Sequence, residues 1–300
     1  MKQRFLPAFL LVTAFAFALA LNSCGNDDAA NGTDSVPVSD SMPASDSNTV
    51  FDPGVPSPGE MFAFMKAAGS PNASGDKLNA PENEKNYNTK KAQSLNLGIY
   101  SADLLYCSTF NISNKVVAYF GTCMRMGTKL NVATSLTDKD KERISKNAGV
   151  ADSLVSISND LYLSTFENLE NNQRGGDLSL MLAGGWVEGL YLMSNMVKDF
   201  DKDKGTAERI LDQKLSLDNL VEFMTKHEAN ADVKAVNDQM KELQTLMNAV
   251  GASDNKTGEV KTKNKKLVIG GGSKSTITKE QFEQIKSKIA EIRTSFVNAQ

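Results

Sequence analysis

Two stretches of this chain are long enough for about five turns of α-helix and carry one charged residue each. Residues 95–112 contain only Asp103, and residues 178–197 contain only Glu188. Apolar residues recur at steps of three and four in both, which is typical of a helix, and they cover nearly every side of it. Such helices need other helices around them, so we expect both stretches at the centre of a helical fold, with both carboxyl groups buried.

The chain after residue 90 has the periodicity of helices nearly throughout, which predicts an all-α fold, a multi-helix bundle. Capping patterns and glycines set the expected helix limits, and Thr278-Lys279-Glu280-Gln281 is expected to form a capping box that opens the last helix. The expected helices are 137–149, 150–175, 177–203, 207–227, 232–250 and 278–298, besides the two around residues 95–130. Whether residues 111–114 form a turn or continue one long helix stays open. A small β-hairpin is expected around Asn264, before the C-terminal helix.

Two segments 85 residues apart resemble each other in sequence. Residues 94–106 and 179–191 are identical at five positions, and Asp103 aligns with Glu188. This similarity predicts two related helical halves, residues 94–165 and 179–250. Leucine-rich helices often match by chance, so a bundle without a repeat is the alternative.

The N-terminal residues 1–23 have the features of a signal peptide. Two basic residues precede an uncharged apolar run, which is too short for a membrane span. The run ends in Leu21-Asn22-Ser23-Cys24, which resembles the bacterial lipobox apart from Asn22, where a small residue is usual. The resemblance implies cleavage before Cys24, acylation of its thiol and amine, with palmitate on the lipoprotein, and a membrane anchor. An ordinary secreted protein with a chance cysteine is the alternative.

Residues 24–50 are expected to form a disordered acidic tether. From Cys24 to Met65 the chain has seven acidic residues and no Lys or Arg. It is also rich in Ser, Pro, Asn and Gly, so it buries too little apolar surface to fold. Gly25 favours the outer membrane over the inner one. Residues 26–28 resemble a short acidic tag for export to the cell surface, although a merely acidic tether accounts for them equally well.

Residues 51–300 are expected to form a single α-helical domain that is nearly neutral in charge. Nothing in it indicates nucleic-acid binding. His227 is the only histidine, which argues against a histidine metal site or a hydrolytic triad. No metal and no cofactor are expected. Cys107 and Cys123 lie on apolar helical stripes and are expected to be buried free thiols, with a disulfide in an oxidising envelope as the alternative.

The two buried acids are the best candidates for a site. Each has an aromatic residue three positions on, whose hydroxyl could be a partner, and Trp186 lies beside the second. The candidate ligand-binding residues are Asp103, Tyr106, Trp186, Glu188 and Tyr191. The alternative is that each acid pairs with a helix N-terminus, Lys or Arg for structural reasons alone.

Three glycines interrupt the second apolar helix and lower its intrinsic stability by about 1 kcal/mol each. Gly184 and Gly185 precede Trp186, and Gly189 follows Glu188. Glycines in such a helix indicate that something approaches closely. We expect Gly185 and Gly189 to admit the backbone of a neighbouring helix, with a ligand groove as the alternative.

The chain from Lys90 to Arg293 resembles uncharacterised Bacteroidetes-type envelope lipoproteins. Residues 96–103, 184–191 and 285–293 carry the resemblance, which implies an envelope lipoprotein and no particular activity. Together these features predict an outer-membrane protein, lipid-anchored at the periplasmic face or cell surface, which binds an envelope protein or a small ligand without catalysis. The alternative is a glycan-acting enzyme with Asp103 and Glu188 as an acid/base pair, whose carboxyl groups would lie about 5 to 9.5 Å apart.

Overall fold

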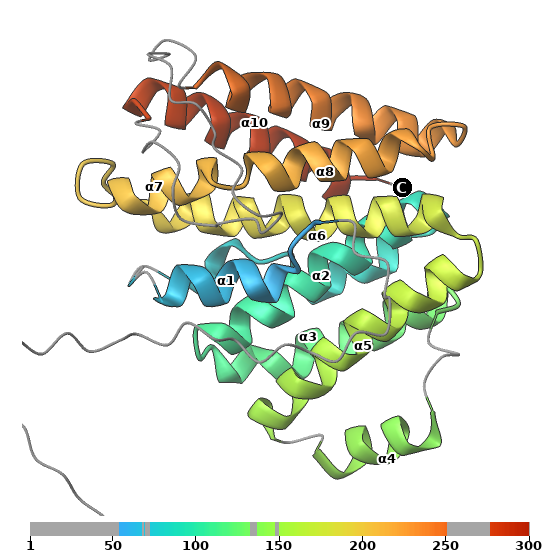
Figure 1. Ribbon diagram of the computed structural model, residues 1–300. Coiled ribbons are helices and arrows are strands. Elements are labelled where there is room, and N and C mark those ends of the chain that lie inside the picture. Colours follow the sequence, from blue (N-terminus) through green and yellow to red (C-terminus); the bar gives the residue numbers. More distant parts are fainter. Residues whose placement is uncertain are drawn as a thin grey trace, which may run out of the picture. The chain divides into compact units, whose positions relative to one another are not determined.

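The computed structural model describes residues 54–67, 69, 73–132, 137–147, 150–250 and 277–299. Within these ranges the chain forms ten α-helices and no strand, which confirms the all-α prediction (Figure 1). The helices are α1 (Pro58–Ala67), α2 (Lys90–Thr109), α3 (Ser113–Lys129), α4 (Asp138–Asn147), α5 (Ala151–Asn171), α6 (Gly175–Met196), α7 (Lys204–Leu211), α8 (Lys214–Thr225), α9 (Ala231–Ala249) and α10 (Lys279–Val297). Two short 3-10 helices, η1 (Gly75–Lys77) and η2 (Pro81–Asn86), precede α2.

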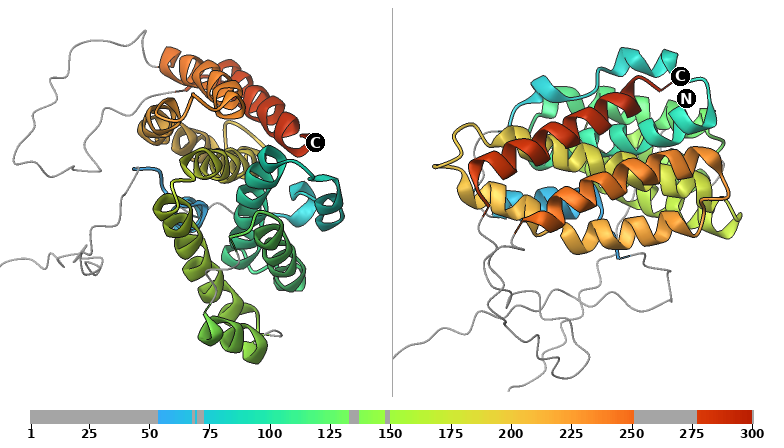
Figure 2. Two further views of the ribbon diagram at one scale, coloured as in Figure 1. Left: turned by 90° about the vertical axis from the view of Figure 1, so that its right-hand side faces the viewer. Right: turned by 90° about the horizontal axis from the view of Figure 1, so that it is seen from above.

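The two apolar helices predicted to be central, α2 and α6, pack against each other at the middle of the bundle. Theirs is the most extensive helix contact among the described residues. Helices α8, α9 and α10 lie on one side of this pair and α3 and α5 on the other (Figures 1 and 2). Helix α1 packs on both α2 and α6, while α4 packs mainly on α5. The buried positions of Asp103 and Glu188 follow from this arrangement, because other elements cover α2 and α6 on all sides.

Glycine permits the close approach of α2 and α6. A Cβ atom at Gly184 would overlap the carbonyl oxygen of Leu95, and one at Gly98 would overlap that of Met181. The prediction of a close helix contact is right for Gly185, whose Cβ would lie 3.3 Å from the backbone oxygen of Gly98, although Gly184 and Gly98 make the closest backbone contacts. Gly189 instead faces the side chain of Met61 on α1.

Most predicted helix limits agree with the structure to within three residues. The exceptions are the end of α5, which lies at Asn171 rather than at Gly175, the end of α6, and the division of one expected helix into two. The chain turns between α2 and α3, where Asn111 has φ +59°, a left-handed conformation that Asn tolerates better than most residues. Helix α6 begins at Gly175 rather than at Asp177 and ends at Met196, because the carboxylates of Asp199 and Asp203 hold the following turn by accepting backbone N–H bonds. The single helix expected at 207–227 is broken into α7 and α8.

The predicted capping box of α10 is confirmed. The hydroxyl of Thr278 accepts from the backbone N–H of Gln281, whose side chain accepts in return from the N–H of Thr278. The predicted hairpin around Asn264 lies outside the described residues. The described helices give no support to two related halves. Helices α3 and α7 each follow the central helix of their proposed half, but they have 17 and 8 residues.

Candidate functional site

The two central acids meet a cation from the C-terminal helix. Asp103 on α2 and Glu188 on α6 have no exposed surface. Arg293 on α10 donates from Nε to Oε2 of Glu188 at 2.9 Å and from Nη2 to Oε1 at 3.2 Å. This two-point ion pair satisfies both oxygens of a carboxylate that could not remain charged alone in the core. We call Asp103, Glu188 and Arg293 the buried triad.

Asp103 completes the triad, and its two oxygens differ in their partners. The backbone N–H of Asn79 donates to its Oδ2 at 3.1 Å, while no donor of the described residues reaches its buried Oδ1. The carboxyl groups of Asp103 and Glu188 interact electrostatically in the core. Burial, and then the negative charge of Glu188, raise the pKa of Asp103 well above its ordinary value.

Arg293 favours the charged form of Glu188. Burial raises the pKa of Glu188, and the charge and hydrogen bonds of Arg293 oppose that rise. The guanidinium also lies over the ring of Tyr191, 4.6 Å from its centre, and donates to the carbonyl oxygen of Lys77. The triad thus joins α2, α6, α10 and the segment before η2 in one set of polar contacts.

The predicted aromatic partners do not hold the two acids. The hydroxyl of Tyr106 accepts from the backbone N–H of Ser74 at 3.1 Å, and the ring of Tyr191 contacts Arg293. Trp186 is buried, and its indole N–H has no partner among the described residues. The alternative of pairing with a cation holds for Glu188, which binds Arg293, whereas Asp103 accepts from the backbone N–H of Asn79.

Arg293 is the member of the triad that sequence reasoning missed. It follows the buried Ile289 by four positions and precedes the buried Phe296 by three, so it lies on the apolar face of α10. A cation on an apolar stripe is a signal that a buried acid lies opposite. The backbone donor of Asn79 gave no such signal, because it comes from an irregular segment.

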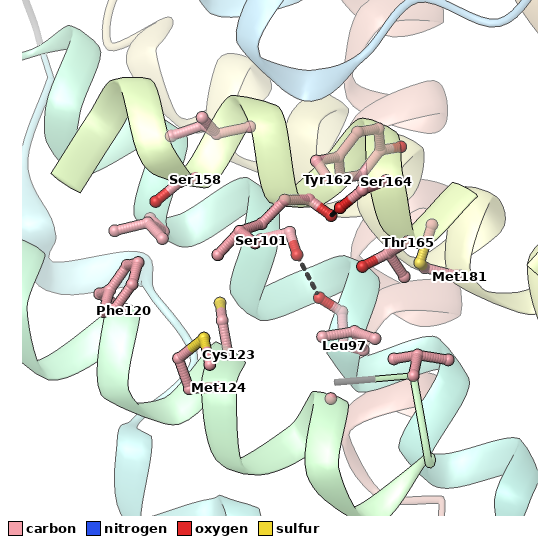
Figure 3. Close-up of a pocket in the computed structure, with 15 residues that line it drawn as sticks. Leu97, Ser101, Phe120, Cys123, Met124, Ser158, Tyr162, Ser164, Thr165 and Met181 are labelled. Carbon is pink, nitrogen blue, oxygen red and sulfur yellow. Dashed lines mark hydrogen bonds between the residues drawn. The ribbon is translucent and has the colours of Figure 1, made fainter. Parts of the chain in front are cut away.

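A separate cavity lies between α2, α3, α5 and α6 (Figure 3). Its volume is about 60 Å³. The lining residues are Leu97, Ser101, Leu104, Leu105, Phe120, Cys123, Met124, Gly127, Val132, Ser158, Leu161, Tyr162, Ser164, Thr165 and Met181. None of the five predicted ligand-binding residues is among them, so the ligand-binding role of those five stays a prediction.

Both thiols of the helical body are free. Cys107 is fully buried, whereas Cys123 is partly buried and lines the cavity, so the expectation of two buried thiols holds for Cys107 alone. Burial raises the pKa of each thiol to about 12. Both are therefore protonated and poorly reactive near neutral pH.

Two other features bear on what the body could do. In the described ranges, no three His, Cys, Asp or Glu side chains gather as a metal site would require. No helix among the described residues is long and apolar enough to cross a membrane. The comparisons add no relative, since no family model, no curated protein and no solved structure matches this chain.

Proposed function

We propose that this chain is a lipid-anchored, non-catalytic helical binding or scaffold module of a bacterial outer membrane, exposed at the periplasmic face or the cell surface. The observation that carries the proposal is the closed state of the buried triad. Asp103 is the only charge between residues 95 and 112, and Glu188 is the only one between residues 178 and 197. Both are buried, and Glu188 is paired with Arg293 instead of facing a cleft.

The same geometry argues against the glycan-acting alternative. An acid/base pair needs its carboxyl groups about 5 to 9.5 Å apart, with room for a sugar or a water between them. Here both groups have no exposed surface, and both oxygens of Glu188 are held by Arg293, so neither carboxyl group faces an open cleft. Glycan hydrolysis by the purified protein that is lost in both Asp103→Asn and Glu188→Gln would refute the non-catalytic proposal.

The membrane anchor in this proposal rests on sequence alone. The basic start, the apolar run and the lipobox-like Leu21-Asn22-Ser23-Cys24 support it, as does the acidic stretch that follows. The resemblance to Bacteroidetes-type lipoproteins is consistent with it. The proposed partners are the membrane through Cys24, and an envelope protein or small ligand bound by the body.

Metabolic labelling tests the anchor directly. In a bacterium grown with an alkyne analogue of palmitate, we expect the wild-type chain to be labelled and to sediment with membranes. Cys24→Ser should lose both the label and the membrane association, whereas Cys107→Ser, the matched control at a buried cysteine, should retain them. A labelled Cys24→Ser protein would refute acylation at this residue.

Two finer features stay predictions within this proposal. The five identities at a spacing of 85 residues support a duplication of 94–165 and 179–250, and the Asn264 region supports a short hairpin. Backbone chemical shifts for residues 252–275 test the hairpin. Helical or irregular values throughout that segment would refute it.

A further inference from the structure

We infer that the cavity between α2, α3, α5 and α6 binds a single unbranched acyl or alkyl chain with an uncharged polar end. This inference names the ligand class for the binding module proposed above and rests on that proposal. The cavity is separate from the buried triad, since none of the three charged residues lines it.

The chemistry of the lining selects a neutral, mostly apolar ligand. Leucine, phenylalanine, valine and methionine side chains make most of the wall, and no charged side chain contributes to it. A charged ligand would lose its hydration here without gaining a counter-charge. An apolar ligand gains dispersion contacts that the cavity walls otherwise lack, as empty apolar cavities in proteins do.

The shape of the cavity selects a narrow chain over a ring system. Its wall follows α2 from Leu97 to Leu105, a rise of about 12 Å at 1.5 Å per residue. Its volume of about 60 Å³ is small for this length. A space that is long and has little volume fits methylene groups placed one after another. The flexible side chains of Met124 and Met181 can adjust to such a chain.

Few hydroxyl groups of the cavity wall are available to bind the polar end of a ligand. The hydroxyls of Ser101, Ser158 and Ser164 donate to carbonyl oxygens of their own helices. Those of Tyr162 and Thr165 have no hydrogen-bond partner among the described residues, and Figure 3 shows the Thr165 oxygen directed toward Ser101 across the cavity. Thr165 can therefore donate to an ester carbonyl or an alcohol oxygen at the end of the chain.

One end of the cavity lies beside the start of α1, where the N-terminal segment joins the body. A Cβ at Gly59 would lie 3.6 Å from Leu105, which lines the cavity, and 3.4 Å from Asn159, which follows Ser158. The acyl chain could thus come from a free lipid or from the lipid proposed on Cys24. The two sources share their chemistry, and the experiment below separates them.

Cys123 is a built-in reporter of occupancy, because its thiol lies in the cavity wall. In the full chain with Cys24→Ser and Cys107→Ser it is the only thiol. We measure its rate of modification by methyl methanethiosulfonate, with 1-octanol as the probe ligand. At ten times its dissociation constant, 1-octanol should slow the reaction about tenfold. Octyltrimethylammonium, which has the same chain and a fixed charge, should have no effect. A rate that 1-octanol leaves unchanged up to its solubility limit would overturn the inference.

Two serines of α5 make a matched pair of variants. Ser158 lines the cavity and Ser156, two positions before it, is exposed. In the single-thiol chain, Ser158→Leu should abolish protection by 1-octanol, and Ser156→Leu should leave it intact. Thr165→Val keeps the volume of the side chain and removes the hydroxyl. It should weaken the binding of 1-octanol by roughly two- to tenfold, the value of one hydrogen bond. This variant keeps the test valid even if Ser158→Leu fails to fold. Equal protection in all three variants would place the alcohol elsewhere.

The lipidated chain, with only Cys107 replaced, identifies the source of the ligand. If its own acyl chain fills the cavity, Cys123 should already react slowly, and Cys24→Ser should restore the faster rate. If the lipidated and unlipidated chains react alike without 1-octanol, and 1-octanol slows both, the occupant is a free lipid. Labelling of Cys24 without any protection of Cys123 refutes the acyl site alone, whereas protection without labelling refutes the anchor alone.

Discussion

Substituting alanine for Gly184 tests whether the contact between α2 and α6 limits the stability of the fold. A Cβ at this position would lie 2.9 Å from the carbonyl carbon of Leu95 and closer still to its oxygen, whereas ordinary contacts begin at 3.4 Å. The obstacle is backbone, which cannot rotate away, so the helices would have to separate by at least about 0.5 Å. Close packing along both helices resists such a shift.

Two opposing terms decide the sign of the effect. Alanine favours a helix over glycine by about 1 kcal/mol, while overpacking a rigid core costs roughly 1–3 kcal/mol and sometimes more. Because backbone atoms take the overlap, we expect a cost at the upper end of that range, which leaves a net loss of about 2 kcal/mol after the gain in helix propensity. Gly189→Ala is the control on the same helix, since its Cβ would meet only the flexible end of Met61 at 3.1 Å and 3.3 Å. For Gly189→Ala we expect the free energy of unfolding to stay the same or to rise by up to about 1 kcal/mol.

Urea denaturation followed by far-ultraviolet circular dichroism measures both changes. If the free energy of unfolding falls with urea concentration at the same slope in each variant as in the wild type, the surface exposed on unfolding is the same in each. We expect the midpoint to fall for Gly184→Ala and to stay or rise for Gly189→Ala. Equal shifts in the two variants would show that helix propensity, rather than the contact with Leu95, decides stability here, and the packing argument would fail.

Further predictions concern the buried triad and α1. Glu188→Gln leaves Arg293 without its counter-charge in the core. We therefore expect the free energy of unfolding, measured by denaturation, to fall by about 3–5 kcal/mol. A loss below about 1 kcal/mol would contradict the burial of the pair. The pKa of Asp103 is raised in the native chain. The unfolded chain therefore releases this proton above about pH 3.9, while the native chain keeps it to higher pH. Asp103 thus makes the free energy of unfolding fall as pH rises toward the pKa of the native state. Asp103→Asn should remove that fall, which unfolding measurements between about pH 4 and pH 8 would detect as a flatter profile than that of the wild type. Phe62→Ala should lower the free energy of unfolding by about 3–5 kcal/mol because the ring is fully buried. Phe64→Ala should lower it by less than about 1 kcal/mol because that residue is 42% exposed. Equal melting temperatures for the two variants would refute the docking of α1 through Phe62.

The central helices and their acids could be predicted from the sequence for a simple reason. A helix without a polar face has no stable place except between other helices, so α2 and α6 had to be central and Asp103 and Glu188 had to be buried. Local signals were equally informative at α10, where Thr278 and Gln281 interact within one turn. These features depend on residues close together in the chain.

What could not be predicted depends on contacts between distant residues. Arg293 meets Glu188 across 105 residues of sequence, and which residue supplies the cation follows from the packing of α10 rather than from any local pattern. The division of α7 from α8 comes without a proline or glycine at residues 212–213. The cavity arises where side chains of four helices fail to fill the space between them, and a sequence pattern does not record such a mismatch.

The late position of Arg293 has a consequence for how the chain folds. The residues are made in order, so both central acids exist before the cation that neutralises their pair. Until α10 docks, helices α2 and α6 can close on each other only with an uncompensated carboxylate between them, or with both acids protonated. The bundle should therefore mature late, in a step that waits for distant parts of the chain to meet, and a ribosome-bound or partly exported chain should hold these helices apart.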